Sequence, residues 1–136
     1  MTKISHEKPP VYERCHELFG VDWVKDRVVF AYGDTIHCAP STTVPADVEA
    51  HEKTHFKQQA AHPGGAKGWW DQYLEDPAFR LSQEIEAYRA QYQWLERNMK
   101  NRNERFRIFM HMVGDLSGPI YGKLMTQQEA MKAIRS

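Results

Sequence analysis

The sequence lacks long apolar runs, blocks of like charge and any dense set of cysteines. No stretch approaches the roughly 20 apolar residues that span a bilayer, and the N-terminus lacks the apolar core of a signal peptide. We therefore expect a cytoplasmic protein with no membrane partner. The two cysteines, Cys15 and Cys38, form no CxxC pair, so we expect reduced, buried thiols rather than a disulfide framework.

An excess of charge of either sign is also missing, because 18 Lys and Arg balance 18 Asp and Glu. Such a chain has no general field to attract nucleic acid, and we predict no nucleic-acid partner. The basic stretch Arg97–Arg107 has Glu96 beside it and Glu104 within it, which is typical of a solvated helix face. The length of 136 residues, with 41% apolar and 26% charged, predicts one globular domain over 1–136 and leaves the oligomeric state open.

The periodicity predicts an α+β fold, mostly helical with one small antiparallel hairpin. Asp76-Pro77 is typical of a helix start, an N-cap followed by proline, and Pro63-Gly64-Gly65 cannot continue a helix. The strands are expected at 27–32 and 35–39, around the turn Gly33-Asp34. The helices are expected at 9–20, 45–61, 69–74, 76–99, 103–113 and 126–134, with a loop at 114–122.

The run His51-Glu52-Lys53-Thr54-His55 carries the chemistry. On a helix, residues four apart project about 40° from one another, so His51 and His55 can bind one metal ion. Glu52 then lies beside the metal, where a general base can act on a metal-activated water. The alternative is a helix with two ordinary histidines. Both histidines, however, fall in the stripe expected to face the core, where buried imidazoles need partners.

A catalytic zinc ion (Zn²⁺) takes a third protein ligand and keeps one position open. The segment Glu84-Ile85-Glu86 on the next long helix is the best source. At about 100° per residue, Glu84 lies about 60° from the centre of that helix's apolar stripe and Glu86 about 140° from it. The sequence therefore favours Glu84 as the ligand and places Glu86 outside it, facing solvent or supporting the site.

The HExxHxxQ helix at 51–58 and the ExEA segment at 84–87 resemble the gluzincin metallopeptidases, in particular small, single-domain, phage-type forms. The resemblance covers about residues 51–91. It implies a zincin-like site in which His51, His55 and Glu84 hold zinc and Glu52 is the base. It also implies that strand 35–39 is an edge strand that pairs with an extended substrate. Tyr88 departs from the pattern, since many such proteins have an acidic residue there to orient a ligand histidine.

The expected function is a zinc-dependent peptidase that hydrolyses peptide bonds in a peptide or protein substrate. A donor to the developing oxyanion is needed as well. Tyr121 and His111 are the candidates, and Tyr121 is preferred. The alternative function is a zinc-stabilised structural or interaction protein, for example in phage assembly, with little turnover. Retention of Glu52 favours the enzyme, because a structural site has no use for a base. A phage-encoded chain would act in the host cytoplasm.

Overall fold

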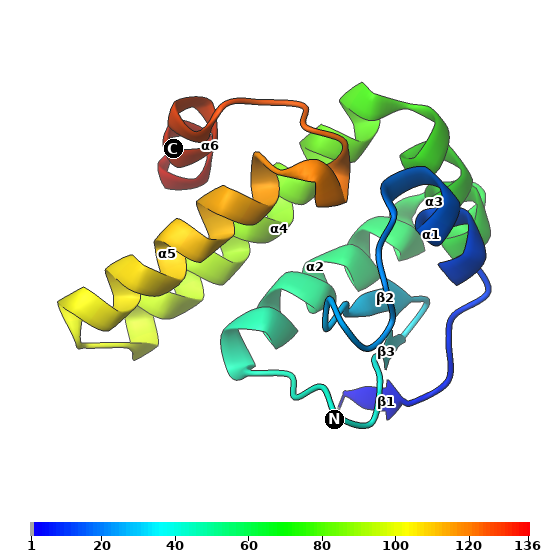
Figure 1. The fold of residues 1–136 in the computed structure, drawn as a ribbon, viewed down its shortest axis with the longest axis horizontal. Helices are drawn as coiled ribbons and strands as arrows, with labels where there is room; N and C mark the ends of the chain where they lie inside the picture. The colour runs from blue at the N-terminus through cyan, green and yellow to red at the C-terminus, as the bar shows by residue number, and fades with distance from the viewer. Residues whose placement is uncertain (1) are drawn as a thin grey trace.

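The computed structural model describes residues 2–136, which form six α-helices, a short 3₁₀ helix and three β-strands (Figure 1). The predicted α+β class, mostly helical with a small sheet, is confirmed. In chain order the elements are β1 (Lys3–Ser5), α1 (Tyr12–Phe19), β2 (Phe30–Tyr32), β3 (Thr35–His37), α2 (Ala46–Ala61), α3 (Gly65–Glu75), α4 (Pro77–Asn98), α5 (Arg102–Leu116), η1 (Pro119–Tyr121) and α6 (Gln127–Arg135). Among the described residues, no helix combines the length and apolarity that a bilayer crossing requires.

Local signals explain most helix boundaries. Asp76 caps α4 by accepting hydrogen bonds from the backbone N–H groups of Ala78 and Phe79. Helix α1 begins at Tyr12 rather than at residue 9, and two helices are longer than predicted. Helix α3 spans 11 residues rather than a short turn at 69–74, and α5 continues through Gly114 to Leu116. Burial of Leu116 accounts for the longer α5, because it outweighs the roughly 1 kcal/mol that a helical glycine costs.

The sheet differs from the predicted hairpin in one way that matters for function. Its strand order is β1-β3-β2, with β1 parallel and β2 antiparallel to β3. Strand β3 is therefore central, and the prediction that residues 35–39 form an edge strand for substrate is wrong. The cause is the polar N-terminal segment, whose Ile4 pairs with Ile36 and covers the edge. A three-residue strand with no apolar alternation gives little signal in the sequence.

The apolar side chains gather in two clusters. One joins α1, the sheet region and α3, and the other joins α4, α5 and α6. In Figure 1, the α4–α5 hairpin with α6 lies on one side, α1 and the sheet lie on the other, and α2 runs between them. Within residues 2–136, α2 contributes no residue to either cluster. Its buried residues are all polar: Asp47, His51, Glu52, His55 and Gln59.

The second cluster should tolerate little loss of volume. Leu95 on α4 is fully buried, so Leu95→Ala removes packed atoms and leaves a cavity. We expect this variant to lower the free energy of unfolding by roughly 2–5 kcal/mol, measured by urea denaturation. The matched control is Glu96→Ala at the exposed neighbouring position, which should stay within about 0.5 kcal/mol of the wild type. Equal effects would contradict the assignment of Leu95 to the core.

Candidate metal centre

The polar face of α2 is held by hydrogen bonds rather than by apolar contact. Near its C-terminal end, Gln59 accepts from the backbone N–H of Gly33 at 2.6 Å and donates to the carbonyl of Ala31 at 2.7 Å. One side-chain amide thus ties α2 to the β2–β3 turn and satisfies both of its own polar groups. This tether fixes the distance between the helix that carries the histidines and the sheet.

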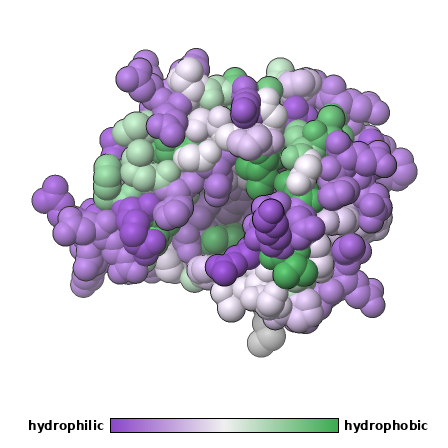
Figure 2. All heavy atoms as spheres, viewed as in Figure 1, coloured by the Kyte–Doolittle hydropathy of each residue, from purple (hydrophilic) through white to green (hydrophobic). Residues whose placement is uncertain are grey.

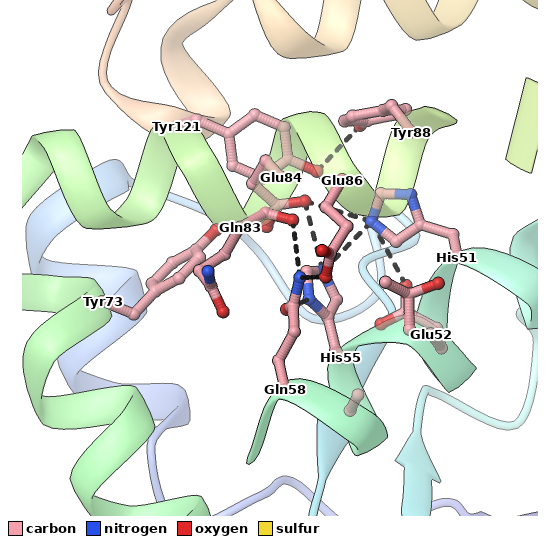
Figure 3. Close-up of polar contacts among 12 residues, drawn as sticks. His51, Glu52, His55, Gln58, Tyr73, Gln83, Glu84, Glu86, Tyr88 and Tyr121 are labelled. Atoms are coloured by element: carbon pink, nitrogen blue, oxygen red, sulfur yellow. Dashed lines mark hydrogen bonds and ion pairs between the residues drawn. The ribbon is translucent and has the colours of Figure 1, made fainter. Parts of the chain in front are cut away.

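Three donor atoms converge between α2 and α4 (Figure 3). The Nε2 atoms of His51 and His55 are 3.2 Å apart. Oε1 of Glu84 lies 3.1 Å from the first and 3.2 Å from the second. All three residues are at most 5% exposed. Two ligand atoms on a tetrahedral zinc, each 2.0–2.1 Å from the ion, are separated by roughly 3.3 Å. The triangle therefore has the size that a small metal ion requires.

The hydrogen bonds on the far side of each ring decide where its proton lies. His51 Nδ1 is 3.0 Å from Gln91 Oε1, and Gln91 Nε2 donates to Asp47 Oδ2 at 2.8 Å. Because a carboxylate only accepts, the amide must turn its NH₂ to Asp47 and its oxygen to His51. Nδ1 of His51 then carries the hydrogen, and its Nε2 presents a lone pair toward Glu84.

His55 repeats this arrangement. Its Nδ1 is 2.7 Å from Gln58 Oε1, and Gln58 Nε2 donates to Glu86 Oε1 at 2.8 Å and to the carbonyl of Gln83 at 3.1 Å. Both neighbours of that NH₂ only accept, so Nδ1 of His55 is the donor as well. Two imidazole lone pairs and a carboxylate oxygen therefore face one another, and this donor set could hold a metal ion.

Glu84 is positioned through its second oxygen. Tyr73 on α3 donates its hydroxyl to Glu84 Oε2 at 2.6 Å, which leaves Oε1 for the two histidines. Burial alone would raise the pKa of Glu84. When a proton lies between the imidazoles and this carboxylate, the charge of His55 and the hydrogen bonds that join Glu84 to the two rings outweigh that effect and hold the pKa of Glu84 well below its ordinary value. Glu84 is therefore ionised, as a metal ligand must be.

Glu52 has different surroundings. His51, Glu52 and His55 form a buried group that could hold a metal ion, with donor atoms within 4.8 Å of one another. Yet Glu52 Oε2 is 3.8 Å from His51 Nε2, farther away than Glu84, and no hydrogen bond from the described residues fixes its carboxyl group. Burial raises its pKa, and the two histidines only partly offset this. Glu52 is thus beside the donor triangle and available to move a proton.

The group lies on a cleft of about 720 Å³. Figure 2 shows this face hollowed near its centre, with a hydrophilic floor and hydrophobic patches beside it. One wall includes Val28 and Val29, just before β2, and the opposite wall includes Ile108 and His111 of α5. Thr42 also lines the cleft. Its hydroxyl is the one buried side-chain polar atom that finds no partner among residues 2–136.

Tyr121, the predicted oxyanion donor, lies on the same cleft, and its hydroxyl is 2.8 Å from that of Tyr88. Burial raises the pKa of Tyr121 well above 10, so it keeps its proton. Tyr88 packs its ring edge against His51, with centroids 4.4 Å apart, and does not take the place of the missing acidic residue. Gln91 orients His51 instead. The other proposed donor, His111, lies on the same cleft, on an exposed face of α5.

The structure thus brings together all the predicted site residues, namely His51, Glu52, His55, Glu84 and Tyr121. Glu86 is exposed, as expected, but its bond to Gln58 connects it to the site. Sequence reasoning missed Asp47, Gln58, Tyr73 and Gln91. Asp47 and Gln58 lie four residues before His51 and three after His55, on the same helix face, and this spacing was the available signal. Tyr73 and Gln91 come from other helices, and their partners depend on packing.

Comparison with known proteins gives no further guide: no family model, no curated protein and no solved structure matches this chain.

The metal-free site should make stability depend on pH. Burial alone would lower the pKa of His55, but the charge of Glu84 and its hydrogen bond raise it from 6.5 to about 9. The folded protein then keeps a proton that the unfolded chain releases above pH 6.5. We expect the metal-free protein to lose stability as the pH rises from about 6.5 to 9, by on the order of 1 kcal/mol per pH unit. The raised pKa of Glu52 acts in the same direction.

Chemical denaturation across this pH range, after chelator treatment, measures the effect. A metal ion displaces the proton, so the loaded protein should lose less stability toward pH 9. If the stability of the metal-free protein is constant or rises between pH 6.5 and 9, the raised pKa of His55 is contradicted.

Proposed function

We propose that this chain is a zinc-dependent peptidase in which His51, His55 and Glu84 hold the ion and Glu52 is the general base. The observation that carries the proposal is the triangle of three lone-pair donors, 3.1–3.2 Å apart, on the cleft. Beside it lies Glu52, whose carboxyl group accepts no hydrogen bond from the described residues. Two imidazoles and one carboxylate are a donor set that suits catalytic zinc, which leaves one coordination position for water or substrate.

Zinc supplies a Lewis acid that lowers the pKa of a coordinated water to about 7. The side chains would do the rest. Glu52, whose pKa is raised by burial, would accept a proton from the attacking water and return it to the leaving amine. Tyr121, protonated and facing the same cleft, donates a hydrogen bond to the oxyanion that develops on the substrate carbonyl. Tyr88 holds that hydroxyl in place.

The cleft is suited to an extended peptide. Because β1 covers β3, the backbone edge nearest the site belongs to the segment that leads into β2, where Val28 and Val29 border the cleft. An extended substrate can pair with this edge through its backbone. We therefore place substrate recognition at residues 28–29 rather than at β3.

The role of the base is tested by Glu52→Gln, which keeps the shape of the side chain and removes its proton affinity. We expect zinc affinity to stay within a few fold of the wild type while turnover on a peptide library falls by about 100-fold or more. Metal analysis and a fluorogenic peptide assay provide the two measurements. Normal zinc binding with equal inactivity of both proteins would remove the peptidase proposal and favour a zinc-stabilised structural or interaction protein.

The ligand assignment is tested by comparing Glu84→Ala with Glu86→Ala. We expect zinc affinity, measured by competition with a chromogenic chelator, to fall far more for Glu84→Ala, because only Glu84 borders both Nε2 atoms. Glu86→Ala should cost at most the 10–100-fold typical of a residue that supports a ligand. The reverse order would exchange the two roles.

The role of Tyr121 is tested by Tyr121→Phe, which should lower kcat by roughly 100- to 1000-fold with little change in zinc affinity. His111→Ala is the comparison variant on the same cleft. If His111→Ala lowers kcat to this extent and Tyr121→Phe does not, His111 is the oxyanion donor.

A further inference from the structure

We propose that Asp47 and Glu86 are positioning residues that hold the two histidines in their metal-binding form, each acting through a glutamine amide. The inference rests on the proposed zinc site, and it concerns residues that touch no donor atom of that site. The buried relay is His51–Gln91–Asp47, and the exposed relay is His55–Gln58–Glu86. Both have the same order of groups, imidazole, amide and carboxylate, although they use different helices.

The carboxylate is needed because an amide alone does not determine which nitrogen of the imidazole carries the hydrogen. A glutamine can present either its oxygen or its NH₂ to a neighbouring ring. With the oxygen toward Nδ1, the imidazole keeps its hydrogen there and Nε2 is free for a metal. With the NH₂ toward Nδ1, the hydrogen moves to Nε2 and the site is lost. Asp47 and Glu86 exclude the second state, because NH₂ is the only end of an amide that can bond to a carboxylate.

The two relays differ in their surroundings. Asp47 is 8% exposed and Gln91 is 5% exposed, whereas Glu86 lies at the surface and Gln58 is half-buried. Hydrogen bonds to an ionised group are stronger where water is excluded, and surface charges are screened by salt. The buried relay therefore controls zinc affinity more strongly, and only the exposed relay weakens at high ionic strength. In the exposed relay, the carbonyl of Gln83 also holds the amide, which further reduces the dependence on Glu86.

The first test is zinc affinity, measured by chelator competition on the full chain. Gln91→Met keeps the approximate volume and removes the acceptor for His51. We expect zinc to bind 10- to 100-fold more weakly, with a smaller loss for Gln58→Met. The matched control is Gln93→Met, on the exposed side of the same helix, which should bind zinc as the wild type does. Wild-type affinity in Gln91→Met would overturn the proposal.

The second test exchanges the amide at position 91 and the carboxylate at position 47. It distinguishes an effect of the hydrogen-bond relay from an effect of side-chain packing. Gln91→Glu alone places two carboxylates against each other, so we expect weaker zinc binding and lower stability. Adding Asp47→Asn restores a donor facing an acceptor. A carboxylate oxygen at position 91 still accepts from His51 in this double variant, so zinc affinity should return to within about 3-fold of the wild type. Packing alone predicts no such recovery, since all these side chains have nearly the same volume. Absence of recovery would overturn the proposal.

Circular dichroism shows whether each variant folds. If Gln91→Met does not fold, the zinc affinities of Gln58→Met and of Gln91→Glu with and without Asp47→Asn test the relay instead. Failure of the relay and failure of the proposed function give different results. If the wild type binds zinc and Gln91→Met binds it equally well, only the relay is overturned. If the wild type binds zinc but hydrolyses no peptide, only the peptidase proposal is overturned. If the wild type binds no zinc, both are overturned.

Discussion

The structure depends on one constraint: helix α2 buries a face made almost wholly of hydrogen-bonding and ionisable groups. A buried polar group without a partner costs on the order of 1–3 kcal/mol, and a buried charge costs more, so this face cannot be stabilised by apolar packing. Neighbouring elements supply hydrogen-bond partners to this face or to its partners, except at Glu52. Strand β2 and its turn meet Gln59, α3 supplies Tyr73 to Glu84, and α4 supplies Glu84 and Gln91. The two apolar clusters on either side hold these elements in position.

This arrangement orients the donor atoms of the site toward one another. Working inward from the carboxylates of Asp47 and Glu86, each hydrogen bond fixes the direction of the next, until two Nε2 lone pairs and a Glu84 oxygen meet. Without a metal ion the group shares a proton, which is why the pKa of His55 is raised and that of Glu84 lowered. The same donor atoms could hold a metal ion in place of that proton.

Much of this was predictable from local sequence. The helical phase of His51 and His55 predicted their convergence, and the position of Glu84 relative to the apolar stripe of its helix predicted that it would face them while Glu86 would not. The central position of β3 was not predictable, because it depends on pairing with β1. That strand has only three residues, Lys3–Ser5, and they show no recognisable strand pattern. Nor were the partners of Gln91 and Tyr73 predictable. Glutamine and tyrosine are common at intermediate depth, and what they contact depends on how α3 and α4 pack against α2. Gln91, one turn after Tyr88, orients His51, and this contact was not predicted either.

The most direct measurement is the zinc K-edge X-ray absorption spectrum of the protein loaded with one equivalent of zinc. The account predicts a first shell of nitrogen and oxygen at about 2.0–2.1 Å with the outer scattering of two imidazoles, and no sulfur near 2.3 Å. A sulfur shell would place the ion at Cys15 or Cys38, and an oxygen-only shell would place it away from His51 and His55. Either result would contradict a metal centre built from His51, His55 and Glu84.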